Sequence, residues 1–157
     1  MTPTERLADL QLTLPKPMQT ASLPFELARL DGSILYLSGH VPTNGDGSLA
    51  QPLGKVGEEV TPEQAYAAAR AVGLGLLATI VEVVGSLDRV EAWLKLFGMV
   101  NVAPGFNNIP PVINGASDLV LEVFGSEVGA HTRSAVGMAE LPFGVPVEIE
   151  AQVRVRS

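Results

Sequence analysis

Arg133, near the C-terminus, is the most informative candidate for chemistry in this sequence, and Glu148 is a second charged residue to weigh beside it. Alternation predicts that Arg133 shares one strand face with three small residues, Ala135, Gly137 and Ala139. Small neighbours leave space beneath a guanidinium, which can bind a small carboxylate through two parallel hydrogen bonds. The spacing also fits, and more often means, a surface ion pair with Glu148 or Glu150. The polar strand face that Glu148 shares with Glu150 and Gln152 usually indicates plain solvent exposure.

Other polar residues could line a ligand pocket. Ser38 and Gly39 precede His40 at the end of a predicted strand, where backbone amides could face a ligand, although turn geometry is the commoner reason for a glycine. Asn114 lies near a predicted helix start, so its amide could cap the helix or donate to a ligand. His131 is expected in a solvated loop. These residues extend the candidate site without defining it.

The composition excludes several classes of site. The 157 residues include no cysteine and two histidines, which rules out a disulfide framework, a thiolate zinc site and a cysteine nucleophile. We expect neither a metal nor a cofactor. The net charge of -7 lacks the basic surface that attracts nucleic acids or anionic membranes. A dinucleotide-type pattern from Gly73 to Ala78 falls inside a predicted helix and not at its start, so helix packing is the better interpretation.

Neither export nor membrane insertion is favoured by the apolar segments. Met1 to Gln11 contains three charged residues and no apolar run of the signal type, which predicts a cytoplasmic protein. Ala65 to Val84 is long enough to span a bilayer, but Arg70 and Glu82 interrupt it and alanine dominates it. A helix lying on a sheet is the better interpretation of this segment.

Apolar periodicity and turn residues predict an N-terminal extension, residues 1–22, followed by a single domain, residues 23–157. The predicted strands are Phe25–Leu30, Ile34–Val41, Arg89–Val100, Thr132–Glu140 and Val147–Val155. The predicted helices are about Pro62–Val84, capped by Thr61 and ended by Gly85, and about Pro111–Phe124, closed by Gly125. The order β-β-α-β-α-β-β indicates an α+β fold with two helices on one face of a mixed, mostly antiparallel sheet.

The strand Arg89–Val100 indicates what covers the second face of the sheet. Its even-numbered apolar residues form a core face, whereas Trp93, Phe97 and Met99 alternate with charged residues on the other face. Large apolar side chains on an uncovered face mark an interaction surface. We therefore expect a partner subunit on that face.

Three ordered segments resemble the YjgF/RidA family of reactive-intermediate deaminases, formerly called endoribonuclease L-PSP or translation-inhibitor proteins. The stretch from Arg133 to Ala151 resembles the family signature R-S-x-V-x-V-x-x-L-P-x-x-x-x-V-E-I-E-A. Tyr36 to Pro42 resembles its S-G-Q-x-P strand end, and Asn114 matches in the second helix. The resemblance covers most of the chain and implies a chorismate-mutase-like fold, assembled as a homotrimer with clefts between subunits.

The resemblance also implies a reaction, the hydrolysis of 2-imino acids to 2-keto acids and ammonia, as in 2-iminobutanoate/2-iminopropanoate deaminases. Arg133 would bind the substrate carboxylate, and Glu148 would position the attacking water. The other residues expected to line the pocket are Ser38, Gly39, Asn114, Phe25 and Ala135. An imine is already electrophilic, so holding it beside a water supplies much of the rate gain.

Two positions depart from the family pattern. Phe25 stands where many deaminating members have tyrosine, and Ala135 replaces a cysteine two residues after the arginine. These departures keep open a second hypothesis, a non-catalytic trimer that binds a small carboxylate or regulates a partner enzyme. A third, ribonuclease activity, follows only from the older family name. The acidic composition and the lack of a basic stripe argue against it.

Overall fold

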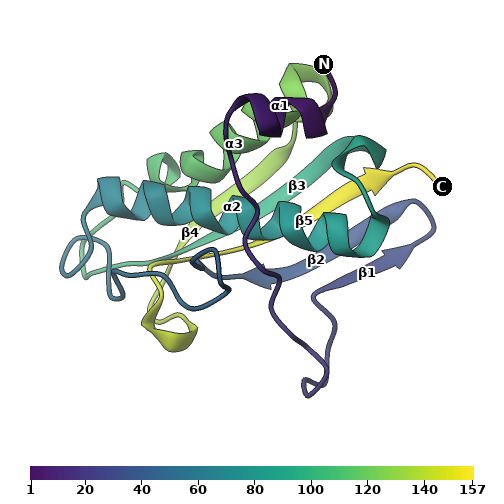
Figure 1. Ribbon diagram of the computed structural model, residues 1–157. Coiled ribbons are helices and arrows are strands. Elements are labelled where there is room, and N and C mark those ends of the chain that lie inside the picture. Colours follow the sequence, from purple (N-terminus) through teal and green to yellow (C-terminus); the bar gives the residue numbers. More distant parts are fainter.

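The computed structural model describes residues 1–157 as one five-stranded sheet with two long helices on one face (Figure 1). The strand order is β1-β2-β5-β3-β4, antiparallel except for the parallel pair of β3 and β4. The strands are β1 (Ala28–Asp31), β2 (Ile34–His40), β3 (Val90–Asn101), β4 (Thr132–Met138) and β5 (Val147–Val155). The helices are α1 (Pro3–Asp9), α2 (Pro62–Val84) and α3 (Pro110–Val128), with single 3-10 turns at Leu87–Arg89 and Pro142–Gly144. The predicted α+β class and element order are confirmed, with α1 as an addition.

The helix α2 begins and ends as its sequence predicts. The Thr61 side chain accepts from the amide of Gln64 at 3.1 Å, and the Gln64 side chain accepts from the amide of Thr61 at 3.0 Å. At the other end Gly85 adopts φ 89°, the left-handed conformation that terminates a helix.

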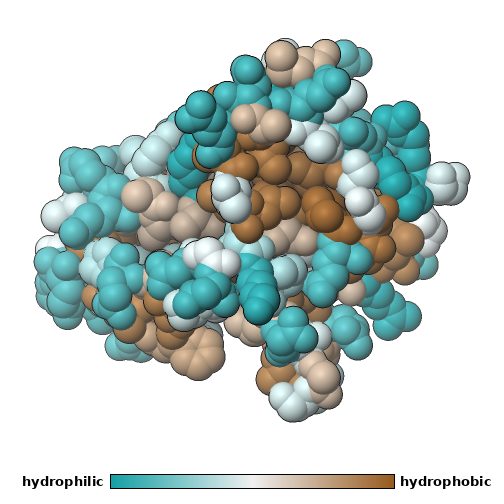
Figure 2. Space-filling model, viewed as in Figure 1, coloured by the Kyte–Doolittle hydropathy of each residue, from teal (hydrophilic) through white to brown (hydrophobic).

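The N-terminal segment explains why α2 is apolar on nearly every side. After α1, which packs on α3, the chain runs across α2 (Figure 1), and Leu12 and Leu14 pack against the core. Figure 2 shows apolar surface gathered around this crossing. By length and composition α2 could span a membrane, but 56% of its apolar window is buried inside the protein. It is therefore a core helix, covered by the sheet on one side and by the crossing segment on another.

The helix α3 continues past its predicted end at Phe124. It runs to Val128, although Gly125 adopts φ 78° and ψ 174° and interrupts the helical backbone. The glycine therefore marks a kink and not the helix end, because it has the conformational freedom to break one helix and start another turn. This added turn brings the chain to Gly129, next to the start of β4.

Bulges in the strands overturn one prediction about which residues face the core. The pairing of β3 with β5 shifts twice, the second time just after Trp93, so the alternation changes step along the strand. Trp93 consequently faces the helices, is 1% exposed and packs edge to face on Phe124, with ring centroids 5.5 Å apart. The prediction that Trp93 lies on the uncovered face is wrong. Phe97 and Met99 do lie there, and both are half-buried.

The two long helices approach each other at glycines. A Cβ at Gly115 would overlap the backbone carbonyl oxygen of Tyr66 on α2, whereas one at Gly75 would meet only the His40 ring, at 3.8 Å. Gly115→Ala is expected to lower the free energy of unfolding by about 2 kcal/mol or more, because α3 must move off α2. Gly75→Ala, the matched control, is expected to raise it by up to about 1 kcal/mol through helix propensity. Chemical denaturation measures both, and equal stabilities would contradict this packing.

Candidate functional site

The sheet separates Arg133 and Glu148, the two residues predicted to take part in chemistry. Arg133 pairs with Leu96 on β3, which is fully buried under the helices, whereas Glu148 pairs with Met99 on the uncovered face. Paired residues point to the same side of a sheet, so Arg133 and Glu148 point to opposite sides. Two strand spacings and three residues along β3 put their Cα atoms about 14 Å apart. The ion pair of Arg133 with Glu148 or Glu150 is excluded, since no salt bridge involves its guanidinium.

The glutamate half-site consists of Ser38, Gly39 and Glu148 and is built on a bulge in β2. Pairing with β5 slips between Leu37 and His40, so the two intervening residues leave the regular ladder. The Glu148 carboxylate lies directly over Gly39, where an added Cβ would overlap its Oε1. Gly39 has no positive φ, so turn geometry does not require a glycine there; its missing Cβ leaves the space that the Glu148 carboxylate occupies.

The bulge also determines what Ser38 can offer a ligand. Its hydroxyl donates to the carbonyl of Glu26 at 2.6 Å, and its amide donates to the carbonyl of Leu27 at 2.8 Å. Because the hydroxyl proton is committed to the backbone, Ser38 can only accept from a ligand. Regular pairing of β1 begins at Ala28, so Phe25 precedes the strand predicted to contain it and is 51% exposed.

Glu148 is more basic than an exposed glutamate. Partial burial raises the pKa of its carboxyl, and the negative charge of Glu150, two residues along β5, raises that pKa further. A carboxylate with a raised pKa is a better proton acceptor for a reaction near neutral pH. The side chain therefore has the properties of a general base.

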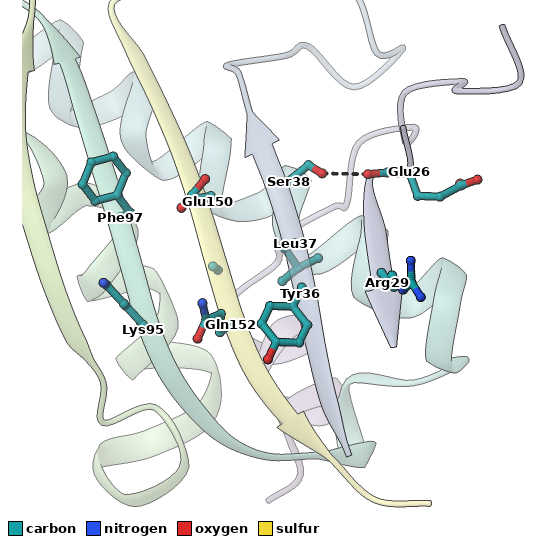
Figure 3. A pocket seen from close by; sticks show the side chains of 10 residues that line it. Glu26, Arg29, Tyr36, Leu37, Ser38, Lys95, Phe97, Glu150 and Gln152 are labelled. Atoms are coloured by element: carbon teal, nitrogen blue, oxygen red, sulfur yellow. Dashed lines mark hydrogen bonds between the residues drawn. The ribbon is translucent and has the colours of Figure 1, made fainter. Parts of the chain in front are cut away.

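A shallow hollow of about 270 Å³ adjoins the glutamate half-site on the uncovered sheet face (Figure 3). Ser38 lies in its wall, and Tyr36, Phe97 and Gln152 contribute further side chains. Its charged residues are two cations and two carboxylates, Arg29, Lys95, Glu26 and Glu150. These charges balance, so an anionic ligand gains no net attraction from the hollow alone. No group of three or more histidine, aspartate or glutamate side chains is placed to hold a metal ion.

His40 lies on the helix side of β2 and does not enter the hollow. Its Nδ1 lies 2.6 Å from the Ser38 carbonyl, its Nε2 lies 2.8 Å from the Thr79 hydroxyl on α2, and the residue is 8% exposed. Burial lowers the pKa of the ring, and the hydrogen bond to Ser38 opposes this only in part. The neutral ring therefore contacts the bulge from the helix side of the sheet and links it to α2 through these two hydrogen bonds.

The arginine half-site consists of Arg133, Asn114, Ser117 and His131, where β4 meets α3. Arg133 donates to the Ser117 hydroxyl at 3.1 Å and to the Pro110 carbonyl at 3.2 Å. Asn114 follows Pro110 by four residues, which puts both on the same side of α3. No side chain caps this helix, so the capping role considered for Asn114 is excluded.

The small residues beside Arg133 do not leave the open space that alternation suggests. A Cβ added at Gly137 would lie 3.0 Å from Ile109 and from Val102, and Ala135 packs against the core. Small side chains here let the start of α3 and the loop before it approach β4. The guanidinium is therefore confined against the first turns of α3.

Ser117 is missing from the residues predicted for the site. His131 is correctly predicted in a loop, but the residue is not fully solvated. His131 is half-buried, with Nε2 lying 2.9 Å from the Ser117 hydroxyl and Nδ1 lying 2.7 Å from the Gly129 carbonyl. Two local spacings point to these residues. Ser117 follows Asn114 by three residues on one helix, and His131 precedes Arg133 by two residues, just before β4 begins at Thr132.

Known proteins are similar to this chain in both sequence and fold. The family described as "YjgF/chorismate mutase-like, putative endoribonuclease" matches residues 4–145. Protein TCP17 of Trypanosoma cruzi is 44% identical over 126 residues, which are 80% of this chain and 78% of that protein. The crystal structure of Atu1372 from Agrobacterium tumefaciens, a protein with unknown function, has a TM-score of 0.88 and 36% identity over 98% of this chain and 92% of that chain. That of a putative endoribonuclease from Shewanella oneidensis MR-1 has a TM-score of 0.92 and 31% identity over 99% of this chain and 100% of that chain.

Proposed function

Because this chain belongs to the YjgF/chorismate mutase-like family, we propose that it hydrolyses 2-imino acids to 2-keto acids and ammonia. The observation that carries the proposal is Arg133, a half-buried guanidinium held by two neutral oxygens and paired with no carboxylate. A partly desolvated charge without a counter-ion is costly, and a bound anion relieves that cost. A carboxylate matches the planar, forked donors that the guanidinium has left.

Glu148 supplies the second group that hydrolysis needs. Glu148 accepts a proton from the water as the water oxygen adds to the imine carbon, and it passes that proton to the imine nitrogen. In the resulting carbinolamine the hydroxyl proton moves, again through Glu148, to the nitrogen, which leaves as ammonia while the carbonyl of the 2-keto acid forms. One imine and one water give one keto acid and one ammonia, so the reaction needs no oxidant or reductant. The raised pKa of Glu148 supports its role as the base.

The two half-sites cannot meet within one chain, because the sheet lies between them. β4, which carries Arg133, is an edge strand, so the arginine half-site lies at a rim that another subunit can approach. The glutamate half-site lies on the uncovered face, where Phe97 and Met99 provide apolar surface for a contact. We propose a homotrimer in which Arg133 of one subunit meets Glu148 of the next.

The proposed activity is tested by generating imines in situ with an amino-acid oxidase and trapping them with semicarbazide. Added protein is expected to slow semicarbazone formation, because hydrolysis removes the imine before it is trapped. Several amino acids, from alanine to larger side chains, cover the range of imines. An unchanged trapping rate with every one of them would overturn the deaminase proposal.

Two inactive variants, Arg133→Ala and Glu148→Gln, are expected to complement each other in mixed trimers. Every mixed trimer contains one cleft with both groups intact, so about a third of wild-type activity should return. Co-expressed chains with different tags, purified through both tags, provide the sample, and each variant purified alone is the control. Mixed trimers without activity would contradict a cleft shared between subunits, and sedimentation velocity establishes that trimers are present.

A second candidate, a trimer that binds a small carboxylate without catalysis, is favoured by the few donors in the glutamate half-site. The hydroxyl proton of Ser38 is already used, and Phe25 carries no hydroxyl. This candidate predicts binding of a 2-keto acid without any effect on semicarbazone formation. Ribonuclease activity gains no support from the hollow, because its two cations are matched by two carboxylates.

A further inference from the structure

Arg133 is the first member of a chain of hydrogen bonds that ends at the backbone of Gly129. Its Nη1 lies 3.1 Å from the Ser117 hydroxyl oxygen, which lies 2.9 Å from His131 Nε2, and His131 Nδ1 lies 2.7 Å from the Gly129 carbonyl. The two ends set the direction of the two outer bonds, and the neutral form of the ring sets that of the middle bond. A guanidinium can only donate and a carbonyl can only accept, so Ser117 accepts from Arg133 and His131 Nδ1 carries a proton. In the neutral imidazole Nε2 is then an acceptor, and Ser117 donates to it.

This arrangement gives the Ser117 hydroxyl one orientation beside a neutral ring. With a neutral ring whose proton is on Nδ1, the hydroxyl proton of Ser117 points at His131 Nε2 and a lone pair of the same oxygen faces Arg133. Ser117 is 8% exposed, so water has little access to replace either partner. His131 therefore orients the hydroxyl that orients the guanidinium.

We infer that Ser117 and His131 are positioning residues for the carboxylate of the ligand, an inference that rests on the proposed function. With the Pro110 carbonyl 3.2 Å from Nη2, one donor of each terminal nitrogen of Arg133 is used. The other N–H groups keep a fixed direction in which a carboxylate can accept two of them. A guanidinium held only through Nη2 would sample more rotamers and lose that freedom on binding.

The start of α3 cannot bind an anion in place of Arg133. Its first two residues, Pro110 and Pro111, have no amide proton, and the amide of Val112 already donates to the Ile109 carbonyl at 3.0 Å. An anion at this helix end therefore depends on side-chain donors. Their orientation is what the hydrogen-bond chain controls.

Calorimetric titration of the full-length protein with 2-oxobutanoate, a 2-keto acid of the product type, tests the inference. Ser117→Ala removes the acceptor for Nη1 and is expected to raise the Kd about tenfold. Two replacements of His131 separate its ring nitrogens, since glutamine places its amide near the position of Nε2 and asparagine near that of Nδ1. His131→Gln is expected to bind within about twofold of wild type and His131→Asn about tenfold more weakly, because only glutamine offers Ser117 an acceptor.

Nitrogen-15 NMR of the arginine side chains gives a readout that needs no ligand. Slow rotation of the Arg133 guanidinium, identified by its absence in Arg133→Lys, is expected in wild type and His131→Gln and is expected to be lost in Ser117→Ala and His131→Asn. Unchanged Kd values in Ser117→Ala and His131→Asn would overturn the inference, even if their unfolding midpoints fall. A wild-type protein with slow rotation but no affinity for 2-oxobutanoate would overturn the proposed function instead, together with the ligand role given to the two residues.

Discussion

Replacing Arg133 with alanine is expected to lower kcat/KM for imine hydrolysis by about a hundred- to a thousandfold and to abolish measurable binding of 2-oxobutanoate. The side chain supplies the unpaired charge of its half-site, and two charge-assisted hydrogen bonds to the ligand are lost with it. Arg133→Lys is expected to recover little of the activity or the binding. An ammonium cannot donate in one plane to the Ser117 hydroxyl, the Pro110 carbonyl and a carboxylate. Semicarbazide competition and calorimetry measure the two effects.

Arg70 provides the matched control for this substitution. It lies on α2 and forms an ion pair with Glu122 on α3 at 2.7 Å, so its replacement removes the same charge at another place. Arg70→Ala is expected to keep kcat/KM within about twofold of wild type and to lose at most about 1 kcal/mol of stability. Equal losses of activity in the two variants, or full activity in Arg133→Ala, would contradict a carboxylate receptor at Arg133.

This sequence predicts where strands lie better than it predicts which face of the sheet each side chain occupies. The range Val147–Val155 matches β5 at both ends, because unbroken alternation identifies both the strand and its core face. β3 alternates less regularly, and each of its bulges moves the following side chains to the opposite face. Trp93 is predicted on the wrong face for this reason, since a bulge changes the alternation without changing the composition.

The arrangement of the candidate site is hard to predict from the sequence for the same reason, because it depends on how strands pair. The resemblance to the family singles out Arg133 and Glu148 as candidates, but whether they share a face depends on how β4 and β5 each pair with β3. Pairing register is a long-range property that no local pattern encodes. Ser117 and His131 differ in this respect, because their spacing from Asn114 and Arg133 is local and could have included them in the site.

The ionised carboxylate of Glu148 lowers the stability of the folded protein. Burial and the charge of Glu150 favour the protonated carboxyl in the folded protein, which is what a raised pKa means. The stabilising contribution of such a group is fully present below its unfolded-state pKa and is lost as the pH rises through the folded-state pKa. At neutral pH an uncharged glutamine should therefore be tolerated at least as well. A chemical role explains an ionisable carboxyl here better than a stabilising role does.

Glu148→Gln is expected to lower kcat by about a hundred- to ten-thousandfold, because an amide cannot accept the proton of the attacking water. The free energy of unfolding at neutral pH is expected to stay the same or rise. In the wild type, kcat is expected to fall as the pH decreases, because protonation removes the base. The raised pKa of Glu148 places that fall at a higher pH than an exposed glutamate would give. Semicarbazide competition at a series of pH values, each with its own protein-free blank, gives the profile.

Glu150→Gln tests whether this acid limb belongs to Glu148. The substitution removes the like charge that contributes to the shift and leaves the burial of Glu148 in place, so the pKa of Glu148 should decrease only in part. The acid limb of kcat is therefore expected to move to lower pH without reaching the position of an exposed glutamate. A limb that does not move in Glu150→Gln would assign the titration to another group. Wild-type kcat in Glu148→Gln would remove Glu148 from the chemistry and require another group as the base.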